Sequence, residues 1–179
     1  MKNTSTGKTT GTTTGRPGLL SAEHIALIDS GVSTIVASRD AAHRPSLMRA
    51  VGASITPDGA QISVFLNRSA STQLLADLQA SGHIAVVFSE PSTHRAVQVK
   101  ASRVQLRDAA AADAPQLQRY LRAMEGQLEP IGFGPRYTRT MLSQEPADLV
   151  VLTFAPEQAF DQTPGPKAGA SLAGTGGAA

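Results

Sequence analysis

The fold class of this chain is decided by Arg44-Pro-Ser-Leu-Met-Arg-Ala-Val-Gly-Ala-Ser-Ile55, then Thr56-Pro-Asp-Gly59, then Ala60-Gln-Ile-Ser-Val-Phe-Leu-Asn67. Both apolar runs predict strands. The turn between them predicts antiparallel pairing, because Pro presets φ, Asp bonds its own backbone and Gly supplies a positive φ. A helix is expected directly afterwards, over residues 71–81, with Ser71 as its N-cap and Gly82 at its C-terminus. This order favours an antiparallel β-fold over a parallel nucleotide-binding sheet.

Further strands follow from apolar, β-branched or alternating segments. They are expected at 32–38, 83–89, 93–106 and 147–155, the last extended by 157–162. Cap residues and helical spacing predict helices at 21–29, 113–128 and 136–143. The sequence contains no Gly-x-Gly-x-x-Gly and no repeated strand–helix alternation. The predicted fold is therefore mainly β with flanking helices, and about six antiparallel strands with edges to hide suggest a small barrel.

The 179 residues fit one domain with two tails. Residues 1–18 are rich in Thr, Gly and Ser and are expected to be disordered, the domain spans 19–162, and 163–179 form a Pro/Gly/Ala-rich C-terminal arm. The tail contains Gly7-Lys8-Thr9, which resembles the end of a phosphate loop. We reject that interpretation because Lys2 stands where the first glycine is required and no strand precedes it.

The composition excludes several classes of protein. There are no cysteines, so disulfides, thiolate metal sites and a cysteine nucleophile are excluded, and a reducing compartment is consistent with their absence. The net charge is only +2 and the basic residues are dispersed, so no nucleic-acid partner is expected. No apolar run spans a bilayer and no secretory signal is present, so the sequence predicts a cytoplasmic protein with no membrane partner.

Familiar catalytic patterns are also missing. The four histidines, His24, His43, His83 and His94, lack metal-ligand spacing, and there is no Gly-x-Ser-x-Gly motif, so neither a metal site nor serine hydrolysis is indicated. His94 begins an expected strand and could face a cofactor or solvent. No residue is a candidate acid or base, so the catalytic residues are unknown.

The start of the helix at 71–81 carries the chemistry of a phosphate site. Arg68, Ser69, Ser71 and Thr72 gather hydroxyls and a guanidinium at a helix N-terminus, where backbone N–H groups also attract anions. The alternative is an ordinary solvated helix start capped by serine. Asn67 could bond either a ligand or the backbone.

In their order and spacing, four segments resemble the pyridoxamine 5′-phosphate oxidase-like family of FMN-binding split barrels. Arg49-Ala-Val51 resembles the Arg-x-Val whose arginine reaches the FMN phosphate. Phe65-Leu-Asn67 with Ser71-Thr-Gln73 resembles the segment lining that phosphate. His83-Ile-Ala-Val-Val-Phe88 resembles the central strand, and Arg95-Ala-Val-Gln-Val-Lys100 resembles the Arg-Gln-Val strand near the flavin.

The resemblance implies a six-stranded antiparallel split β-barrel that binds FMN. It also implies a homodimer with the flavin between its subunits, so that Arg95, Gln98 or Lys100 of one chain would lie near a flavin held by Arg49 of the other. The cofactor-binding residues carried over, with the polar neighbours at the helix start, are Arg49, Val51, Asn67, Arg68, Ser69, Ser71, Thr72, Gln73, Arg95 and Gln98.

The departures from the family pattern limit the expected chemistry. Gln73 stands where the family has a phosphate-binding Lys, and Ala96 replaces the Gln of Arg-Gln-Val. After Val151 there is no Arg or His to hold a pyridoxal substrate, which argues against the vitamin B6 oxidase reaction. The expected function is a flavin-dependent oxidoreductase on a small molecule. The alternatives are a non-catalytic flavin-binding or sensing protein, or a split barrel that binds haem or no cofactor.

Overall fold

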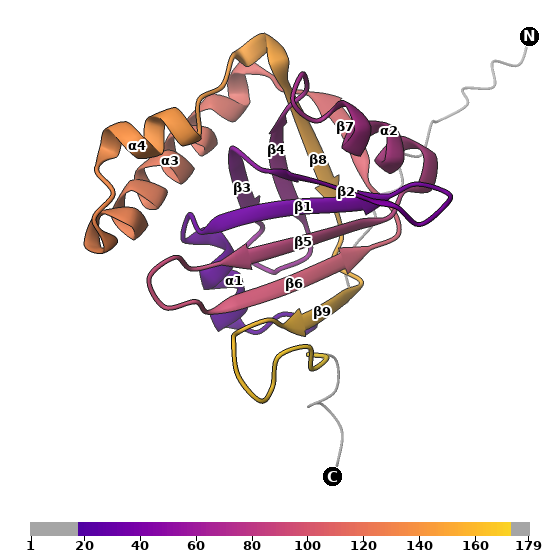
Figure 1. The fold of residues 1–179 in the computed structure, drawn as a ribbon, viewed down its shortest axis with the longest axis horizontal. Coiled ribbons are helices and arrows are strands. Elements are labelled where there is room, and N and C mark those ends of the chain that lie inside the picture. The colour runs from indigo at the N-terminus through magenta and orange to yellow at the C-terminus, as the bar shows by residue number, and fades with distance from the viewer. Residues whose placement is uncertain (1–17, 173–179) are drawn as a thin grey trace, which may run out of the picture.

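The computed structural model describes residues 18–172, so all but the last residue of the tail expected over 1–18, and part of the expected arm, lie outside it. Within this range the chain forms two antiparallel sheets, ordered β2-β1-β5-β6-β9 and β3-β4-β8-β7 (Figure 1). We call them sheet A and sheet B. The strands are β1 Ser33–Arg39, β2 Pro45–Arg49, β3 Gly52–Ile55, β4 Ile62–Asn67, β5 Ile84–Ser89, β6 Ala96–Ala101, β7 Gln105–Asp108, β8 Leu149–Phe154 and β9 Gln158–Asp161.

Four α-helices flank the sheets in the described part of the chain, and none of them is long and apolar enough to cross a membrane. They are α1 Ala22–Asp29, α2 Thr72–Ser81, α3 Ala114–Leu128 and α4 Pro135–Met141, with short 3-10 turns η1 Ala111–Asp113, η2 Glu129–Ile131 and η3 Pro146–Asp148. The helix bounds agree with the sequence prediction within about two residues. The capping signals explain this agreement, since Ser21 and His24 form a capping box and Gly82 ends α2 with φ 69°.

The predicted antiparallel, mainly β class is confirmed, but the strand number is not. Three expected strands are each divided in two, so that nine strands replace six among residues 18–172. Each division is a point where the chain leaves one sheet and joins the other: after Arg49, after Ala101 and after Phe154. A strand that bends between two sheets cannot keep a continuous ladder, which is the reason for the difference.

The main core lies between the two sheets. Alternate residues of β1, β5 and β6 point inward, among them Val36, Val86 and Val99, and meet Val64 and Leu152 from sheet B. All five are fully buried. With no tryptophan in the sequence, this core depends on branched aliphatic side chains, whose burial contributes roughly 25 cal/mol per Å² of apolar area.

A second apolar cluster lies on the outer face of sheet B, beneath α3. Phe65 and Val151 pair across β4 and β8 on this face and pack with Leu117 of α3. The approach is so close that a Cβ on Gly52 would lie 2.6 Å from Leu117 Cδ2. At the other end of the helix, Gly31 has φ +71° and an added Cβ would lie 2.4 Å from the Cβ of Ala123. These contacts fix α3 against the β-structure.

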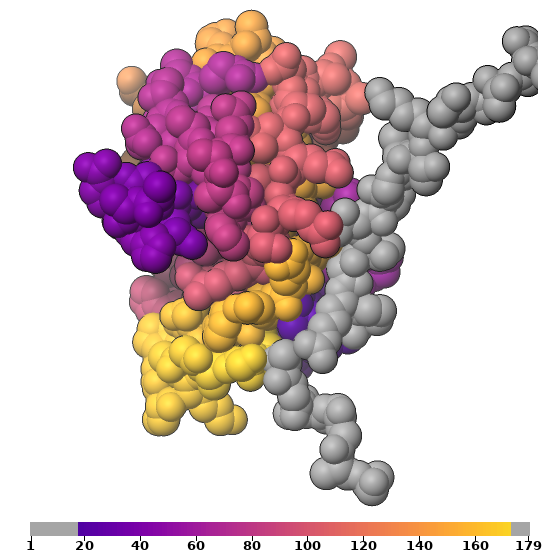
Figure 2. Space-filling view, turned by 90° about the vertical axis from the view of Figure 1, so that its right-hand side faces the viewer, coloured from indigo at the N-terminus to yellow at the C-terminus, as the bar shows by residue number. Residues whose placement is uncertain are grey.

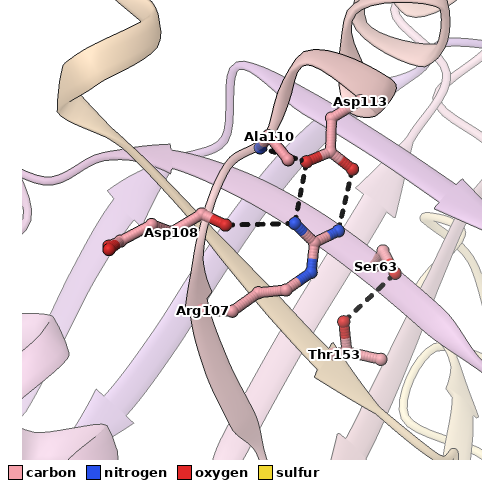
Figure 3. Close-up of polar contacts among 6 residues, drawn as sticks. All are labelled: Ser63, Arg107, Asp108, Ala110, Asp113 and Thr153. Atoms are coloured by element: carbon pink, nitrogen blue, oxygen red, sulfur yellow. Dashed lines mark hydrogen bonds and ion pairs between the residues drawn. The ribbon is translucent and has the colours of Figure 1, made fainter.

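An ion pair joins β7 to the start of α3. The guanidinium of Arg107 donates two 2.8 Å hydrogen bonds to the carboxylate of Asp113, which also accepts from the backbone N–H of Ala110 (Figure 3). These bonds, above all those from Arg107, lower the pKa of Asp113 below its ordinary value. Nearby on sheet B, the hydroxyls of Ser63 and Thr153 face each other across β4 and β8 (Figure 3).

The described part of the expected arm folds back on the last strand. The N–H of Asp161 donates to Ala170 O at 2.9 Å, and the N–H of Leu172 donates to Ala159 O at 2.8 Å. Residues 163–172 therefore cover the outer edge of sheet A beside β9, where unpaired backbone groups would otherwise face solvent.

Candidate functional site

No helix of residues 18–172 lies over the outer face of sheet A, which faces the viewer in Figure 1. The strand register arranges its side chains in two rows that cross the sheet. The first row is Arg49, Ile35, Val87, Gln98 and Phe160, and the second is Leu47, Ala37, Ala85, Lys100 and Gln158. Leu47 is 63% exposed, the most exposed of the large apolar side chains among residues 18–172. This face is a mixed apolar and cationic surface, suited to a ligand or a second subunit.

Arg49 ends β2 immediately before the chain crosses to sheet B. Its guanidinium is exposed and donates one hydrogen bond, from Nη1 to Ser33 Oγ at 2.7 Å. Its charge also acts on the buried phenol of Tyr120, whose pKa burial raises to about 12. Most of the guanidinium donors of Arg49 therefore remain available to an anion.

The start of α2, which the sequence predicted as a phosphate site, is already occupied in part by carboxylates of this chain. Asp148 accepts from both the N–H of Ser69, at 2.9 Å, and its hydroxyl, at 2.6 Å. Arg68 forms an ion pair with Asp108. These two carboxylates hold the donors that a phosphate would use at Ser69 and Arg68. Asp108 ends β7 of sheet B, and Asp148 ends the turn η3 just before β8.

Two polar atoms at the same helix start are buried without a partner. Ser71 is 1% exposed, and its hydroxyl neither caps α2 nor has another hydrogen-bond partner within residues 18–172. The Oδ1 of Asn67 is likewise buried and unpaired, although its amide nitrogen donates to Ser143 O at 3.0 Å. Because buried polar groups are almost always satisfied, an uncapped helix start with an orphaned hydroxyl fits an additional hydrogen-bonding group. This geometry is compatible with a phosphate held by Ser71 and the first N–H groups of α2.

The remaining expected residues, in α2 and just before β3, have mainly structural surroundings. Gln73, which replaces the family lysine, donates to Asp77, and Asp77 also accepts from the hydroxyl of Ser46 on β2. Thr72 is exposed beside it. Val51 is 7% exposed and packs with Phe65 and α3 in the second cluster.

The two interface residues expected in and before β6 lie in different places. Gln98 lies in the same row as Arg49 but three strands away, roughly 14 Å at the usual strand spacing. Arg95 lies in the connection before β6 and lines a cleft against α1 that also contains Glu90 and Glu23. The single chain therefore brings Gln98 onto the face of Arg49 and leaves Arg95 apart from it.

Sequence reasoning missed the acidic partners of the site, Asp77, Asp108 and Asp148. Only Asp77 had a local signal, because it lies four residues after Gln73 on the predicted helix. Among residues 18–172 no three His, Asp or Glu side chains gather closely enough to hold a metal ion.

No family model and no curated protein sequence matches this chain. Its fold does match solved structures. A putative pyridoxamine 5′-phosphate oxidase from Lactobacillus delbrueckii superposes with a TM-score of 0.52 at 13% identity, over 83% of this chain and 99% of that one. HupZ of Group A Streptococcus gives 0.51 at 15% identity, over 84% and 99%. An F420 reductase gives 0.50 at 14% identity, over 75% and 93%.

The chain therefore has the split-barrel fold of the pyridoxamine 5′-phosphate oxidase-like proteins, as its sequence predicted. At these identities the likeness establishes the fold, and the chemistry must be argued from the residues of this chain.

Proposed function

We propose that this protein binds a flavin, FMN, with its phosphate between Arg49 and the start of α2, and that it uses the flavin for oxidoreduction of a small molecule. The observation that carries the proposal is the orphaned hydroxyl of Ser71 at an uncapped helix start. The fold adds support, because a solved structure of the same fold is an F420 reductase, whose cofactor is a deazaflavin.

The chain would contribute binding and orientation to such a site. A dianionic phosphate gains charge-assisted hydrogen bonds from Arg49, each worth roughly 1.5–3 kcal/mol, and dipole stabilisation from the ten-residue helix α2. A bound flavin supplies hydride transfer. The apolar side chains of the outer face of sheet A, Ile35 and Val87 among them, would exclude water from one side of a flat ring.

The same face supports a homodimer as the functional unit. Leu47 is largely exposed, and the side chains beside it on β1 and β5 are only half-buried. This sheet face is therefore available to a second copy of the chain. In a two-fold arrangement, Gln98 of one chain could lie against the flavin held by Arg49 of the other. Light scattering at micromolar concentration should then give about twice the 18.5 kDa chain mass. A monomer that binds FMN with full affinity would refute the shared site.

The test of FMN binding is a titration of the apo-protein with FMN and, separately, with riboflavin, which lacks the phosphate. Arg49→Ala should weaken FMN binding by roughly 10–100-fold, and Ser71→Ala should weaken it by about fivefold. Riboflavin binding should change little in either variant. Arg122→Ala, an exposed arginine on α3, is the matched control. Equal losses for FMN and riboflavin would remove these residues from the phosphate site.

A second candidate, a split barrel without bound FMN, is favoured by the carboxylates at Ser69 and Arg68 and by Gln73 in place of lysine. Asp148→Asn separates the two proposals. If a phosphate binds beside Asp148, removing the negative charge should tighten FMN binding by about fivefold, roughly 1 kcal/mol. A colourless protein that binds neither FMN nor F420 in wild type or Asp148→Asn would favour the second candidate. A yellow protein that a nicotinamide donor does not bleach would favour flavin binding without turnover.

A further inference from the structure

A second hollow opens on the outer face of sheet A, at the far end from Arg49. Its volume is about 490 Å³, within the range of small-molecule pockets. It lies where β1 ends and β5 begins, beside the turn that joins β1 to β2. Figure 2 shows that this turn, in indigo, stands out from the surface above the yellow segment that contains β9. None of the residues assigned above to the flavin phosphate lines it.

The floor of this pocket is flat and apolar. Ala37 and Ala85 are directly paired across β1 and β5, and their small side chains leave the sheet surface open between larger neighbours. Pro45 forms one wall. Cross-strand alanines on a sheet face expose a planar patch a few ångströms wide, which matches the face of an aromatic ring.

The rim of the pocket is basic. Arg39, His43, His83 and Lys100 line it, contributed by β1, the β1–β2 turn, the start of β5 and β6. The side chains of Arg39, His43 and His83 have no ion pair or hydrogen bond to another group within residues 18–172. Lys100 lies over the ring of Phe160, 4.7 Å from its centre, and likewise has no carboxylate partner.

The nearby carboxylates only partly offset the positive charge of this rim, because Glu157 accepts from neutral donors and keeps its own negative charge. Glu157, the one carboxylate lining the pocket, accepts from the N–H of Ser102 at 3.0 Å and from its hydroxyl at 2.8 Å. Asp40, next to Arg39, is bound instead by the guanidinium of Arg44 at 2.7 Å. Two fixed cations, Arg39 and Lys100, and two histidines therefore face one cavity with a single carboxylate, which leaves an excess of positive charge and of N–H donors.

We propose that this pocket binds a small aromatic anion, with its ring on Ala37 and Ala85 and its carboxylate or phosphate group at Arg39 and His83. An anion recovers the charge-assisted hydrogen bonds that these donors lack within the described chain, and the flat floor selects a ring over an extended chain. The site is separate from the FMN phosphate site and does not depend on it.

The test uses phenyl phosphate as the probe, with benzyl alcohol as the uncharged analogue and inorganic phosphate as the head group alone. Binding is followed by backbone amide NMR shifts of residues 37–39, 83–85 and 100–102 and by calorimetry. Phenyl phosphate should bind at least tenfold more tightly than either analogue. Arg39→Gln should weaken it about tenfold, while Arg122→Gln, the same change on an exposed surface of α3, should leave it unaltered.

A second variant tests the floor without altering any charge. Ala85→Leu should weaken phenyl phosphate at least tenfold and leave inorganic phosphate unchanged, because it fills the ring position only. Phenyl phosphate should also bind the Arg49→Ala variant normally, and saturating FMN should not displace it. Equal binding of benzyl alcohol, equal loss in Arg122→Gln, or one-for-one displacement by FMN would overturn a separate anion site.

Discussion

The outer face of sheet B is covered by α3, whereas no helix in the described part of the chain covers the outer face of sheet A. On sheet B, Phe65 and Val151 are fully buried beneath the helix, and Arg107 and Asp113 fasten its first turn. On sheet A, Leu47 is mostly exposed and half-buried residues alternate along β1 and β5. Both faces carry aliphatic side chains, so composition alone does not separate them. What separates them is whether this chain supplies the covering layer.

The comparison leads us to expect that substitutions on sheet B act mainly on stability, whereas those on the outer face of sheet A act mainly on the binding proposed above. Within residues 18–172 the chain buries one apolar face with its own helix and leaves the other open, and an open apolar face is where a ligand or second subunit can bind. Both proposed ligand sites lie on or beside that open face. Four substitutions test the distinction, and they are ordered here by the size of the effect expected.

Phe65→Ala should have the largest effect, because it removes a fully buried ring between sheet B and α3. The free energy of unfolding should fall by roughly 3–5 kcal/mol, measured by urea denaturation. A matched valine pair serves as control: Val151→Ala, under the helix, should cost about 2 kcal/mol, and Val87→Ala, on the open face, less than about 1 kcal/mol. Equal costs for the two valines would contradict the comparison.

Asp113→Ala tests the polar contacts that hold the start of α3 and should cost roughly 1–3 kcal/mol. It leaves the Ala110 N–H without its acceptor and leaves Arg107 with only the backbone carbonyl of Asp108. The folded pKa of Asp113 is lowered, so its contribution is fully present above about pH 4 and is lost as the pH falls through the folded pKa. Wild type and variant should therefore converge in stability in acid. A gap that stays constant down to pH 2 would show that the loss is one of packing.

Tyr120→Phe should have a smaller effect, about 1 kcal/mol, because Val32 O loses a 2.6 Å hydrogen bond but keeps the hydroxyl of Thr34. The folded pKa near 12 lies above the unfolded value of about 10. The phenol thus stabilises the fold fully below pH 10, and this part is lost as the pH rises through 12. Alkaline denaturation of both proteins measures it; an identical pH dependence would argue against a buried phenol.

Leu47→Gln should hardly change the free energy of unfolding of a single chain, by within about 0.5 kcal/mol, because the side chain is mostly in water. If the open face pairs with a second copy, the same change should raise the dimer dissociation constant about tenfold in sedimentation experiments. Arg44→Gln, exposed in the neighbouring turn, is the control. An unchanged dimer would move the interface away from sheet A.

The local features of this fold could be predicted from sequence, and the crossings between sheets could not. Helix ends are marked by capping residues such as Ser21 and Gly82, whose interactions reach only a few residues along the chain. The divided strands left weaker signals in the sequence. Ala50 and Val51 are apolar in succession, and both are buried, which breaks the alternation of a flat strand. Pro156 has no N–H to donate to a ladder. These marks identify a bend but not which sheet receives the chain beyond it.

The candidate site shows the same division. The hydroxyls and the guanidinium at the start of α2 were visible in the sequence, but their acidic partners were not, and Ser71, predicted as the N-cap, makes no side-chain capping bond. Arg68 meets Asp108 forty residues later, and Ser69 meets Asp148 seventy-nine residues later. No local pattern marks such a pair, because the contact exists only once sheet B is assembled.

The pairing that completes sheet B also sets the order of events in folding. Ser63 on β4 and Thr153 on β8 are ninety residues apart in the chain, whereas β1 and β2, or β3 and β4, are joined by short turns. Closing so long a loop is slow, so we expect the hairpins to form first and β8 to arrive late. Until then β4 presents an open edge, where nascent chains are most prone to aggregate. Sheet B, the sheet that α3 covers, is therefore the one we expect to be completed last during folding.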